Sequence, residues 1–464
     1  MGNAAFKAIL ERGDTKVRLL VRDSKKNRKA MRPYLKRDDV TVVWGDLLDP
    51  VSVKRGLGKA RTVLHLGGMV SPMADRFPEK TLKVNVGGTK NVVNAIRERE
   101  DRDEIRLIYI GSVAQTSDRR EPYHWARTGD PVMASEFDYY GLSKILAERE
   151  VAESGLRHWV SLRQTGILHP GLFLRGNDPI TFHVPLRGVL EWATVEDSGR
   201  LMAALCADSL PDSLWGNFFN IGSGAPYRLT NYEFEKLILG AIGSPAPEKI
   251  FETNWFATRN FHGSWFLDSD KLNELVPFRE GVPVEEYFRK MVKKAPWWAR
   301  MAPLAPPALV KRMMRKVALT PGYGTLDWVR RRDCEDRINA FFGSREERDT
   351  IPGWEDFDLS RPSEEATLLN HGYDETLPES ETDIEVCRQA AAFRGGKCLS
   401  ETMTKGDLAT RLKWECGRGH TFEASPALVL KGGHWCPDCL PAPWRYREEA
   451  TFNRFLAQTG IFSS

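Results

Sequence analysis

The run Asp138-Tyr-Tyr-Gly-Leu-Ser-Lys-Ile-Leu-Ala-Glu148 places Tyr140 four residues before Lys144. Because a helix repeats every 3.6 residues, the two side chains are expected on one helical face. An ammonium group lowers the pKa of a neighbouring phenol, which is roughly 10 in the free side chain, so Tyr140 is expected to exchange a proton near neutral pH. Upstream, the apolar run Ile105–Ile110 predicts a strand that ends just before Ser112, where open α/β sheets place their ligands. The three side chains together predict a hydride-transfer site.

The segments before this site alternate between strand-like and helical patterns. Strands are predicted over Val17–Val21, from Val42 onward and over Thr62–Leu66, with helical stretches between them. This alternation favours a parallel sheet. A Tyr four residues before a Lys is common on a solvated helix face, so the order of elements supports an α/β fold more strongly than the pair does.

Further motifs follow in a recognisable order. They are Gly45-Asp-Leu47, His65-Leu-Gly-Gly68, Asn85-Val-Gly-Gly-Thr89, Arg163-Gln-Thr-Gly-Ile-Leu-His-Pro170, Val195-Glu-Asp197 and Phe219-Asn-Ile-Gly-Ser223. With Ser112, Tyr140 and Lys144, they resemble the extended short-chain dehydrogenase/reductase superfamily and its NAD(P)-dependent epimerase/dehydratase group. The resemblance covers about residues 1–290 and implies a Rossmann-type doubly wound parallel sheet with a small substrate lobe.

The resemblance also implies a role for each residue of the site. Tyr140 would exchange the proton of the substrate hydroxyl, and Ser112 would orient the substrate oxygen. Lys144 would hold the nicotinamide ribose and, with the positive nicotinamide ring, lower the pKa of Tyr140. Tyr139 lies one residue off the lysine face and is expected to pack against the domain. The implied coenzyme-binding residues are Gly2, Arg22, Asp46, Leu47, Leu66, Gly67, Gly68, Asn85, Tyr140 and Lys144.

The chain departs from the family pattern at its start. Rossmann folds of this kind open with a strand and a Gly-x-x-Gly-x-x-Gly turn that receives the pyrophosphate. Gly2 falls where the third glycine belongs, so the first strand and two glycines would precede Met1. We expect a start codon placed too far downstream rather than a natural truncation, because a sheet without its middle strand leaves ladder groups unpaired. A natural truncation would leave a damaged nucleotide site.

Coenzyme choice depends on the end of the Val17–Val21 strand. NAD enzymes usually carry an Asp there to bind the ribose 2′-hydroxyl, whereas this chain has Leu20-Val-Arg-Asp-Ser-Lys-Lys26. Arg22 and the two lysines suit a 2′-phosphate, so NADP is preferred over NAD. The alternative is that these cations form an ordinary solvated loop.

The substrate class is predicted from missing residues. Members that dehydrate nucleotide sugars carry an Asp-Glu pair after the hydroxyl residue, and this chain has Val113-Ala114. The Asn and Tyr-Gly-Pro of sugar-nucleotide epimerases are replaced in Arg163–Pro170. We therefore expect interconversion of a ketone or aldehyde and an alcohol on a small molecule, with a nucleotide-sugar epimerase as the alternative. Five tryptophans are predicted to be core rather than pocket lining: Trp125, Trp192, Trp215, Trp255 and Trp265.

Length and charge suit several domains in one chain. The 464 residues are 41% hydrophobic and carry a net charge of +4, which gives no global argument for nucleic acid or a membrane. No apolar run approaches the roughly 18 to 20 residues of a membrane helix, and no leader pattern follows Met1, so a cytoplasmic protein is expected. The predicted parts are a reductase region with substrate lobe (1–290), a helical extension (291–345), an exposed acidic linker (346–385), a zinc module (386–442) and a tail (443–464).

The extension mixes basic, aromatic and Met residues over Lys293–Lys316. Such a segment can lie on a membrane surface or close over a substrate. Helices that dock on the substrate lobe are the favoured alternative.

The C-terminal part contains Cys416-x3-His420 and Cys436-x2-Cys439. Four such ligands suit tetrahedral zinc, and the pattern resembles small zinc-ribbon or treble-clef modules. With four protein ligands and no open position, the metal is expected to be structural. Cys398 is left outside the site, and His434 is expected to lie beside the ligands or to be exposed.

This module supports a hypothesis of another class. Related ribbons occur on nucleic-acid enzymes, so the chain is alternatively an NADP sensor or scaffold whose zinc module binds nucleic acid or protein. Against it, the intact Ser112, Tyr140 and Lys144 would be unexplained, and the basic residues of the module form no stripe.

The resemblance also implies a homodimer. The seven cysteines agree with a reducing compartment.

Overall fold

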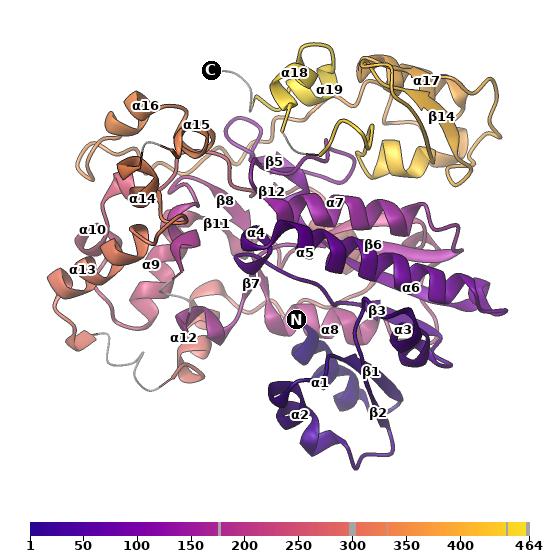
Figure 1. The fold of residues 1–464 in the computed structure, drawn as a ribbon, viewed down its shortest axis with the longest axis horizontal. Helices are drawn as coiled ribbons and strands as arrows, with labels where there is room; N and C mark the ends of the chain where they lie inside the picture. Colours follow the sequence, from indigo (N-terminus) through magenta and orange to yellow (C-terminus); the bar gives the residue numbers. More distant parts are fainter. Residues whose placement is uncertain (175–177, 297–302, 332, 442–443, 461–464) are drawn as a thin grey trace.

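The computed structural model describes residues 1–464 except 175–177, 297–302, 332, 442–443 and 461–464. Its centre is a parallel four-stranded sheet in the order β10–β6–β4–β3. The strands are β3 (Thr62–His65), β4 (Arg106–Ser112), β6 (His158–Gln164) and β10 (Asn217–Ile221). With helices on both faces, this architecture confirms the predicted α/β class (Figure 1).

The sheet has two cores because successive side chains of a strand point to opposite faces. Leu107 and Tyr109 of β4 face a core that contains α3 (Pro50–Leu57), α6 (Gly88–Arg97) and α7 (Tyr139–Ala152). Ile108 and Ile110 face the other core, with α1 (Gly2–Arg12), α8 (Val195–Ala204) and α11 (Ser269–Leu275). These strands are almost wholly buried, which explains their continuous apolar runs.

The first two strands form a separate parallel sheet. β1 (Val17–Val21) coincides with the predicted strand, and β2 (Val40–Trp44) begins two residues earlier than predicted. In the described residues neither strand bonds to β3.

The part of the chain predicted to be a substrate lobe, called the lobe below, combines short strand pairs with helices. It contains β8 (Val189–Glu191) with β11 (Arg228–Thr230), β7 (Ile167–Leu168) with β9 (Ala193–Thr194), β5 (Trp125–Ala126) with β12 (Trp265–Phe266), and helices α9 (Asn231–Ala241), α10 (Pro247–Ile250) and α12 (Val284–Lys293). Smaller helices elsewhere are α2 (Lys25–Met31), α4 (Met73–Arg76) and α5 (Pro78–Leu82).

The helical extension packs on this lobe. Its helices are α13 (Pro307–Ala318), α14 (Thr325–Arg330), α15 (Glu335–Phe342) and α16 (Arg345–Asp349). Val310, Met314 and Val317 of α13 pack against a lobe core that includes Phe182 and Phe251. This packing agrees with the docking helices that were preferred for the segment, although the Trp-containing stretch 297–302 lies outside the described residues.

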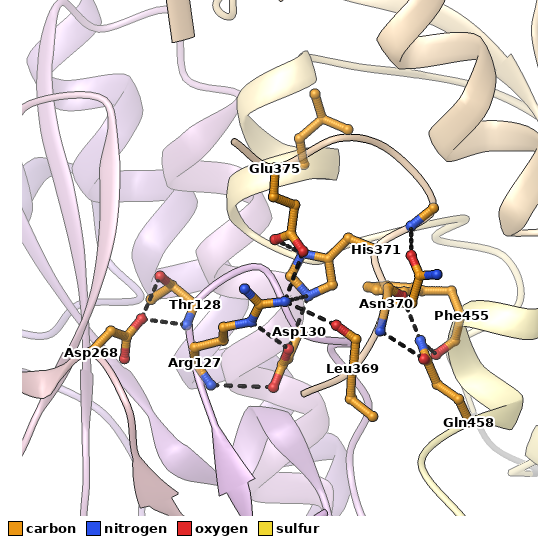
Figure 2. Close-up of polar contacts among 12 residues, drawn as sticks. Arg127, Thr128, Asp130, Asp268, Leu369, Asn370, His371, Glu375, Phe455 and Gln458 are labelled. Atoms are coloured by element: carbon orange, nitrogen blue, oxygen red, sulfur yellow. Dashed lines mark hydrogen bonds and ion pairs between the residues drawn. The ribbon is translucent and has the colours of Figure 1, made fainter. Parts of the chain in front are cut away.

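Residues 350–378 form a strap with no helix or strand in it. Figure 2 shows how the strap is tied down near His371, whose side chain is almost fully buried. Nε2 of His371 lies 2.9 Å from Asp130 Oδ1, and Nδ1 lies 2.7 Å from Glu375 Oε1. Arg127 adds a hydrogen bond from Nη2 to the Leu369 carbonyl, at 2.9 Å. The strap therefore lies against residues 1–290, which are called the reductase region below after their predicted function.

The C-terminal module lies along α7 (Figure 1). It contains α17 (Ile384–Phe393) and an antiparallel sheet of β13 (Lys397–Cys398), β14 (Leu412–Glu415) and β15 (Thr421–Ala424), followed by α18 (Tyr446–Ala450) and α19 (Arg454–Ala457). Trp414 and Trp435 of the module share one apolar core with Trp159 and Val151 of the reductase region. Across the described residues, every helix is too short or too polar to cross a bilayer.

Candidate functional site

The three predicted catalytic residues converge at the carboxyl end of β4. Ser112 is the last residue of this strand, and its Oγ accepts a hydrogen bond from Ala114 N. Tyr140 and Lys144 lie one turn apart in α7, which begins where Asp138 Oδ1 accepts from Gly141 N at 2.6 Å. A hydrogen bond links the side chains of Ser112 and Tyr140. Tyr139 packs instead against Trp444, with ring centroids 5.6 Å apart.

The protein by itself does not lower the pKa of Tyr140. Burial, with the charges of Asp138 and Asp75, raises that pKa to about 12 and outweighs the lowering by the Ser112 hydrogen bond. Lys144 lies 6.0 Å from the Tyr140 ring centroid, and its Nζ donates to the Ile110 carbonyl at 2.7 Å. Burial lowers the pKa of Lys144 to about 8, although Glu148 acts in the opposite direction. Our expectation of a lowered Tyr140 pKa overlooked this desolvation.

The loop after β3 is built around Asn85. Its Oδ1 accepts from Met69 N at 2.7 Å, while Nδ2 donates to Met69 O at 3.0 Å and to Ser143 Oγ at 2.8 Å. Asn85 thus joins this loop to α7. A Cβ on Gly68 would lie 2.9 Å from Asn85 Oδ1, which explains the glycine there.

Leu47 packs against the same loop. A Cβ on Gly67, the residue after Leu66, would lie 2.7 Å from Leu47 Cδ1. Asp46, next to Leu47, accepts from Leu48 N through Oδ1 at 2.9 Å. The predicted coenzyme residues that follow β2 and β3 therefore lie together.

The two other predicted coenzyme residues, Gly2 and Arg22, lie in the first part of the chain. Gly2 begins α1, which packs along α8. Arg22 follows β1 and is exposed, as are Lys25 and Lys26. Within the described residues, none of these three cations has an ion pair, so they stay available to an anionic ligand.

The four predicted metal ligands form one cluster. Ligand atoms of Cys416, His420, Cys436 and Cys439 all lie within 4.8 Å of one another. Cys416 Sγ and Cys439 Sγ are 3.8 Å apart, and His420 Nδ1 lies 3.4 Å from Cys439 Sγ. A tetrahedral site with metal–sulfur bonds of about 2.3 Å has sulfur–sulfur edges of roughly 3.8 Å, so the cluster fits such a metal. A hydrogen bond with Cys439 lowers the pKa of the Cys436 thiol to about 6, which favours a thiolate.

The two neighbours of this cluster differ in position. Cys398 lies in β13, opposite Trp414, and is not part of the cluster. His434 is fully buried. The sequence allowed this side chain to be exposed, and that alternative is wrong. Its Nε2 lies 2.8 Å from Glu148 Oε1 of α7, because the second ligand pair is docked on that helix.

A pocket opens beside the first turn of α7. It holds about 660 Å³ of space between protein atoms, part of it open to solvent. Asp75 and Asp138 line it from the reductase region, His262 from the lobe, and Tyr323 and Arg337 from the helical extension. His262 Nδ1 lies 2.9 Å from Asp138 Oδ2. Burial and the charge of Asp138 raise the pKa of Asp75 to about 6.

None of the five tryptophans considered above lines this pocket. Trp125, Trp255 and Trp265 are buried, while Trp192 and Trp215 pack against the edges of apolar cores. The preference for core positions agrees with this packing.

Comparison with known proteins gives a family match for the first part of the chain. Residues 1–166 match the NAD dependent epimerase/dehydratase family. The predicted resemblance is thereby confirmed for the epimerase/dehydratase region.

Curated relatives match part of the chain. The 3 beta-hydroxysteroid dehydrogenase type 7 of Rattus norvegicus is 31% identical over 120 residues, which are 25% of this chain and 35% of the relative. The protein of the same name from Homo sapiens is 30% identical over 142 residues, 28% of this chain and 38% of the relative. The chain thus spans little more than a third of the length of these relatives.

A solved structure extends the likeness in fold. The dTDP-glucose 4,6-dehydratase of Bacillus anthracis, in complex with NAD, is similar with a TM-score of 0.50 at 12% identity. The similarity covers 63% of this chain and 91% of the dehydratase chain. At this identity the likeness concerns the fold alone.

Sequence reasoning missed several side chains around the epimerase/dehydratase region. Asp138 carries a usable signal, since an Asp before a helical run is a common N-cap. The sequence carries no such signal for Asp75, His262 and Arg337. Each comes from a different part of the chain, and only folding brings them to one pocket.

Proposed function

We propose that the chain is an NAD(P)-dependent oxidoreductase that interconverts a ketone or aldehyde and an alcohol. The observation that carries the proposal is the hydrogen-bonded pair Ser112 and Tyr140, with Lys144 one turn along the same helix. The family of residues 1–166 is NAD dependent, and the curated relatives are named as hydroxysteroid dehydrogenases, which supports alcohol–ketone chemistry.

In the proposed reduction, the chain would hold a nicotinamide coenzyme, which would supply the hydride for a carbonyl carbon when bound. Ser112 holds the carbonyl oxygen by a hydrogen bond, and Tyr140 transfers its phenolic proton to that oxygen. The phenolate then regains a proton from solvent. Lys144 holds the nicotinamide ribose, and its charge, together with that of the oxidised ring, favours the phenolate in the reverse direction.

NADP is the preferred coenzyme. Arg22, Lys25 and Lys26 follow β1, are exposed and have no ion pair in the described part of the chain, and a 2′-phosphate would lie at this strand end. We assign the remaining contacts to the glycine at the start of α1 and to the loops after β2 and β3, through Gly2, Asp46, Leu47, Leu66, Gly67, Gly68 and Asn85.

We further propose that the ligand cluster of the module binds zinc in a structural role. Three thiolates and one imidazole with these separations suit zinc, and all four positions come from the protein. The substrate is proposed to be a small molecule other than a nucleotide sugar, because Val113-Ala114 replaces the acidic pair of the dehydratases.

The test is a titration with NADPH, and with NADH in parallel, read by energy transfer from tryptophan to nicotinamide. It is made on the chain as given and on a version extended by its in-frame upstream codons. A panel of ketones and aldehydes then compares Tyr140→Phe with the matched control Tyr139→Phe. We expect only Tyr140→Phe to lose activity, by roughly 10²- to 10⁴-fold. The proposal is wrong if neither version binds a coenzyme.

A further inference from the structure

The second ligand pair of the metal cluster is docked on the proposed catalytic helix. His434, two residues before Cys436, places Nε2 2.8 Å from Glu148 Oε1 in α7. Two neighbouring carbonyl groups accept further hydrogen bonds: Gly432 O from Arg163 Nη2 at 2.6 Å, and Trp435 O from Arg149 Nη1 at 3.1 Å. The loop 432–436 therefore contacts α7 and β6 through Gly432, His434 and Trp435.

Glu148 stands at the centre of this contact. Its side chain and those of Arg163 and His434 are fully buried. From β6, Ser161 Oγ donates to Glu148 Oε2 at 2.6 Å, and Arg163 Nη2 donates to Oε1 at 2.6 Å. The carboxylate is thus held by the sheet on one side and by the module on the other.

Glu148 lies four residues after Lys144, so the two side chains share one face of α7. Lys144 is also buried, and its Nζ reaches the Ile110 carbonyl of β4. Because the two side chains belong to consecutive turns, the contacts that hold Glu148 also hold the turn next to the one that presents Lys144.

A second contact fixes the end of the same helix. Just beyond α7, Glu153 accepts hydrogen bonds from Ser425 N at 3.0 Å and from Ser425 Oγ at 2.7 Å, and it pairs with Arg411. The module therefore holds α7 at Glu148 and, just beyond its end, at Glu153. The contact at Glu148 is made by His434, which lies two residues before the metal ligand Cys436.

We propose that His434 is a positioning residue for the coenzyme site and that metal binding sets its position. A metal held by Cys436 and Cys439 would immobilise the loop 432–436, which holds His434 against Glu148 and thereby Lys144 in place. Affinity for the coenzyme then depends on the metal, although none of the four ligands is among the residues proposed to hold the coenzyme. The inference rests on the proposed role of Lys144 in holding the nicotinamide ribose.

The experiment uses the full chain with its metal content measured. NADPH is titrated by tryptophan-to-nicotinamide energy transfer before chelation, after chelation and after zinc is added back. The same titration is made on His434→Ala and His434→Gln, because a glutamine amide can still donate to Glu148. His124→Ala is the matched control, since His124 is equally buried but bonds to the Ser363 carbonyl of the strap. Unfolding midpoints are recorded for every sample.

We expect chelation and His434→Ala each to weaken NADPH binding by roughly tenfold, within the usual range of coupling between two sites. Zinc should reverse the first effect. His434→Gln should bind within about threefold of the wild type, and His124→Ala should bind unchanged.

Two results would overturn the inference. The first is a His434→Ala variant that keeps its metal and fold and binds NADPH as the wild type does. The second is a chelated wild type whose affinity for NADPH is unchanged. This result decides the question even if His434→Ala does not fold. If neither the chain as given nor the extended version binds NADPH or NADH, the proposed function fails, and the inference falls with it.

Discussion

Helix α7 of the reductase region and helix α9 of the substrate lobe each bury one glutamate, and the surroundings of the two differ. Glu148 in α7 has Arg163, Ser161 and His434 as partners, and these partners hold its pKa well below the usual range. Glu235 in α9 has no ion pair or side-chain hydrogen bond in the described part of the chain, and burial raises its pKa to about 7. Burial therefore favours the neutral form unless partners are present.

The partners of Glu148 come from two places in the chain. Arg163 and Ser161 belong to β6, and His434 belongs to the C-terminal module. The sheet and the module therefore both help to hold Glu148 as a charged group. In the described residues the module supplies no ion pair or side-chain hydrogen bond to Glu235, so the two regions should respond differently to mutation, metal and pH.

The largest expected effect comes from removing a metal ligand. In Cys439→Ser, we expect bound metal to fall from about one per chain to near zero, and the module to lose its fold, because metal binding supplies much of the folding free energy of such modules. Glu148 would then lose its His434 partner and resemble Glu235 more closely. Metal analysis and thermal unfolding measure the change. Cys398→Ser is the control, and equal metal loss in both variants would contradict the assignment.

The next largest effect is expected for Glu148→Ala. Removing the carboxylate leaves the guanidinium of Arg163 buried without its counter-charge, which should lower the free energy of unfolding by about 3–5 kcal/mol. Urea unfolding at pH 7.5 measures it. Glu235→Ala serves as the comparison and should destabilise far less. Similar losses in the two variants would mean that partners do not distinguish the two regions.

Glu235→Gln should stabilise the protein at alkaline pH. The folded-state pKa of about 7 lies above the usual 4.5, so the wild type loses stability as pH rises from about 4.5 through 7. The neutral glutamine avoids this loss, and we expect a gain of ~2–3 kcal/mol at pH 8 that vanishes near pH 4.5. Unfolding free energies at several pH values test it. A gain that does not depend on pH would argue against a neutral Glu235.

The smallest effect is expected for Tyr287→Phe in the lobe. The buried hydroxyl donates to the Leu168 carbonyl at 2.9 Å and also contacts Glu196 at 2.5 Å. Its removal should cost about 1–2 kcal/mol, less than Glu148→Ala, because no buried ion loses its counter-charge. Chemical denaturation measures the loss, and Tyr227→Phe, which removes a bond to the Val282 carbonyl, should behave alike. A loss above that of Glu148→Ala would reverse the comparison.

Much of the local structure was predictable because it depends on near neighbours. The strand Val17–Val21 and the helix that carries Tyr140 and Lys144 follow from short apolar patterns and helical spacing. The metal cluster was predictable for the same reason, since each ligand pair lies within one short loop. The family of residues 1–166 followed from the order of such motifs.

Other features could not be predicted from local pattern. The pKa of Tyr140 was predicted to fall, and burial with two carboxylates raises it instead. His434 was placed beside the ligands or in solvent, and it is buried against a helix 286 positions earlier in the chain. Residues 346–385 were predicted as an exposed linker, although His371 within them is buried in a charged cluster.

The sequence by itself determined the α/β class, the shared helical face of Tyr140 and Lys144 and the four metal ligands, because spacing along the chain controls each of them. Only the tertiary structure decided which buried charges have partners, which side chains meet in the pocket and where the module lies. The physical reason is that desolvation and ion pairing depend on distances in space, and Glu148, Arg163 and His434 come together only when the whole chain has folded.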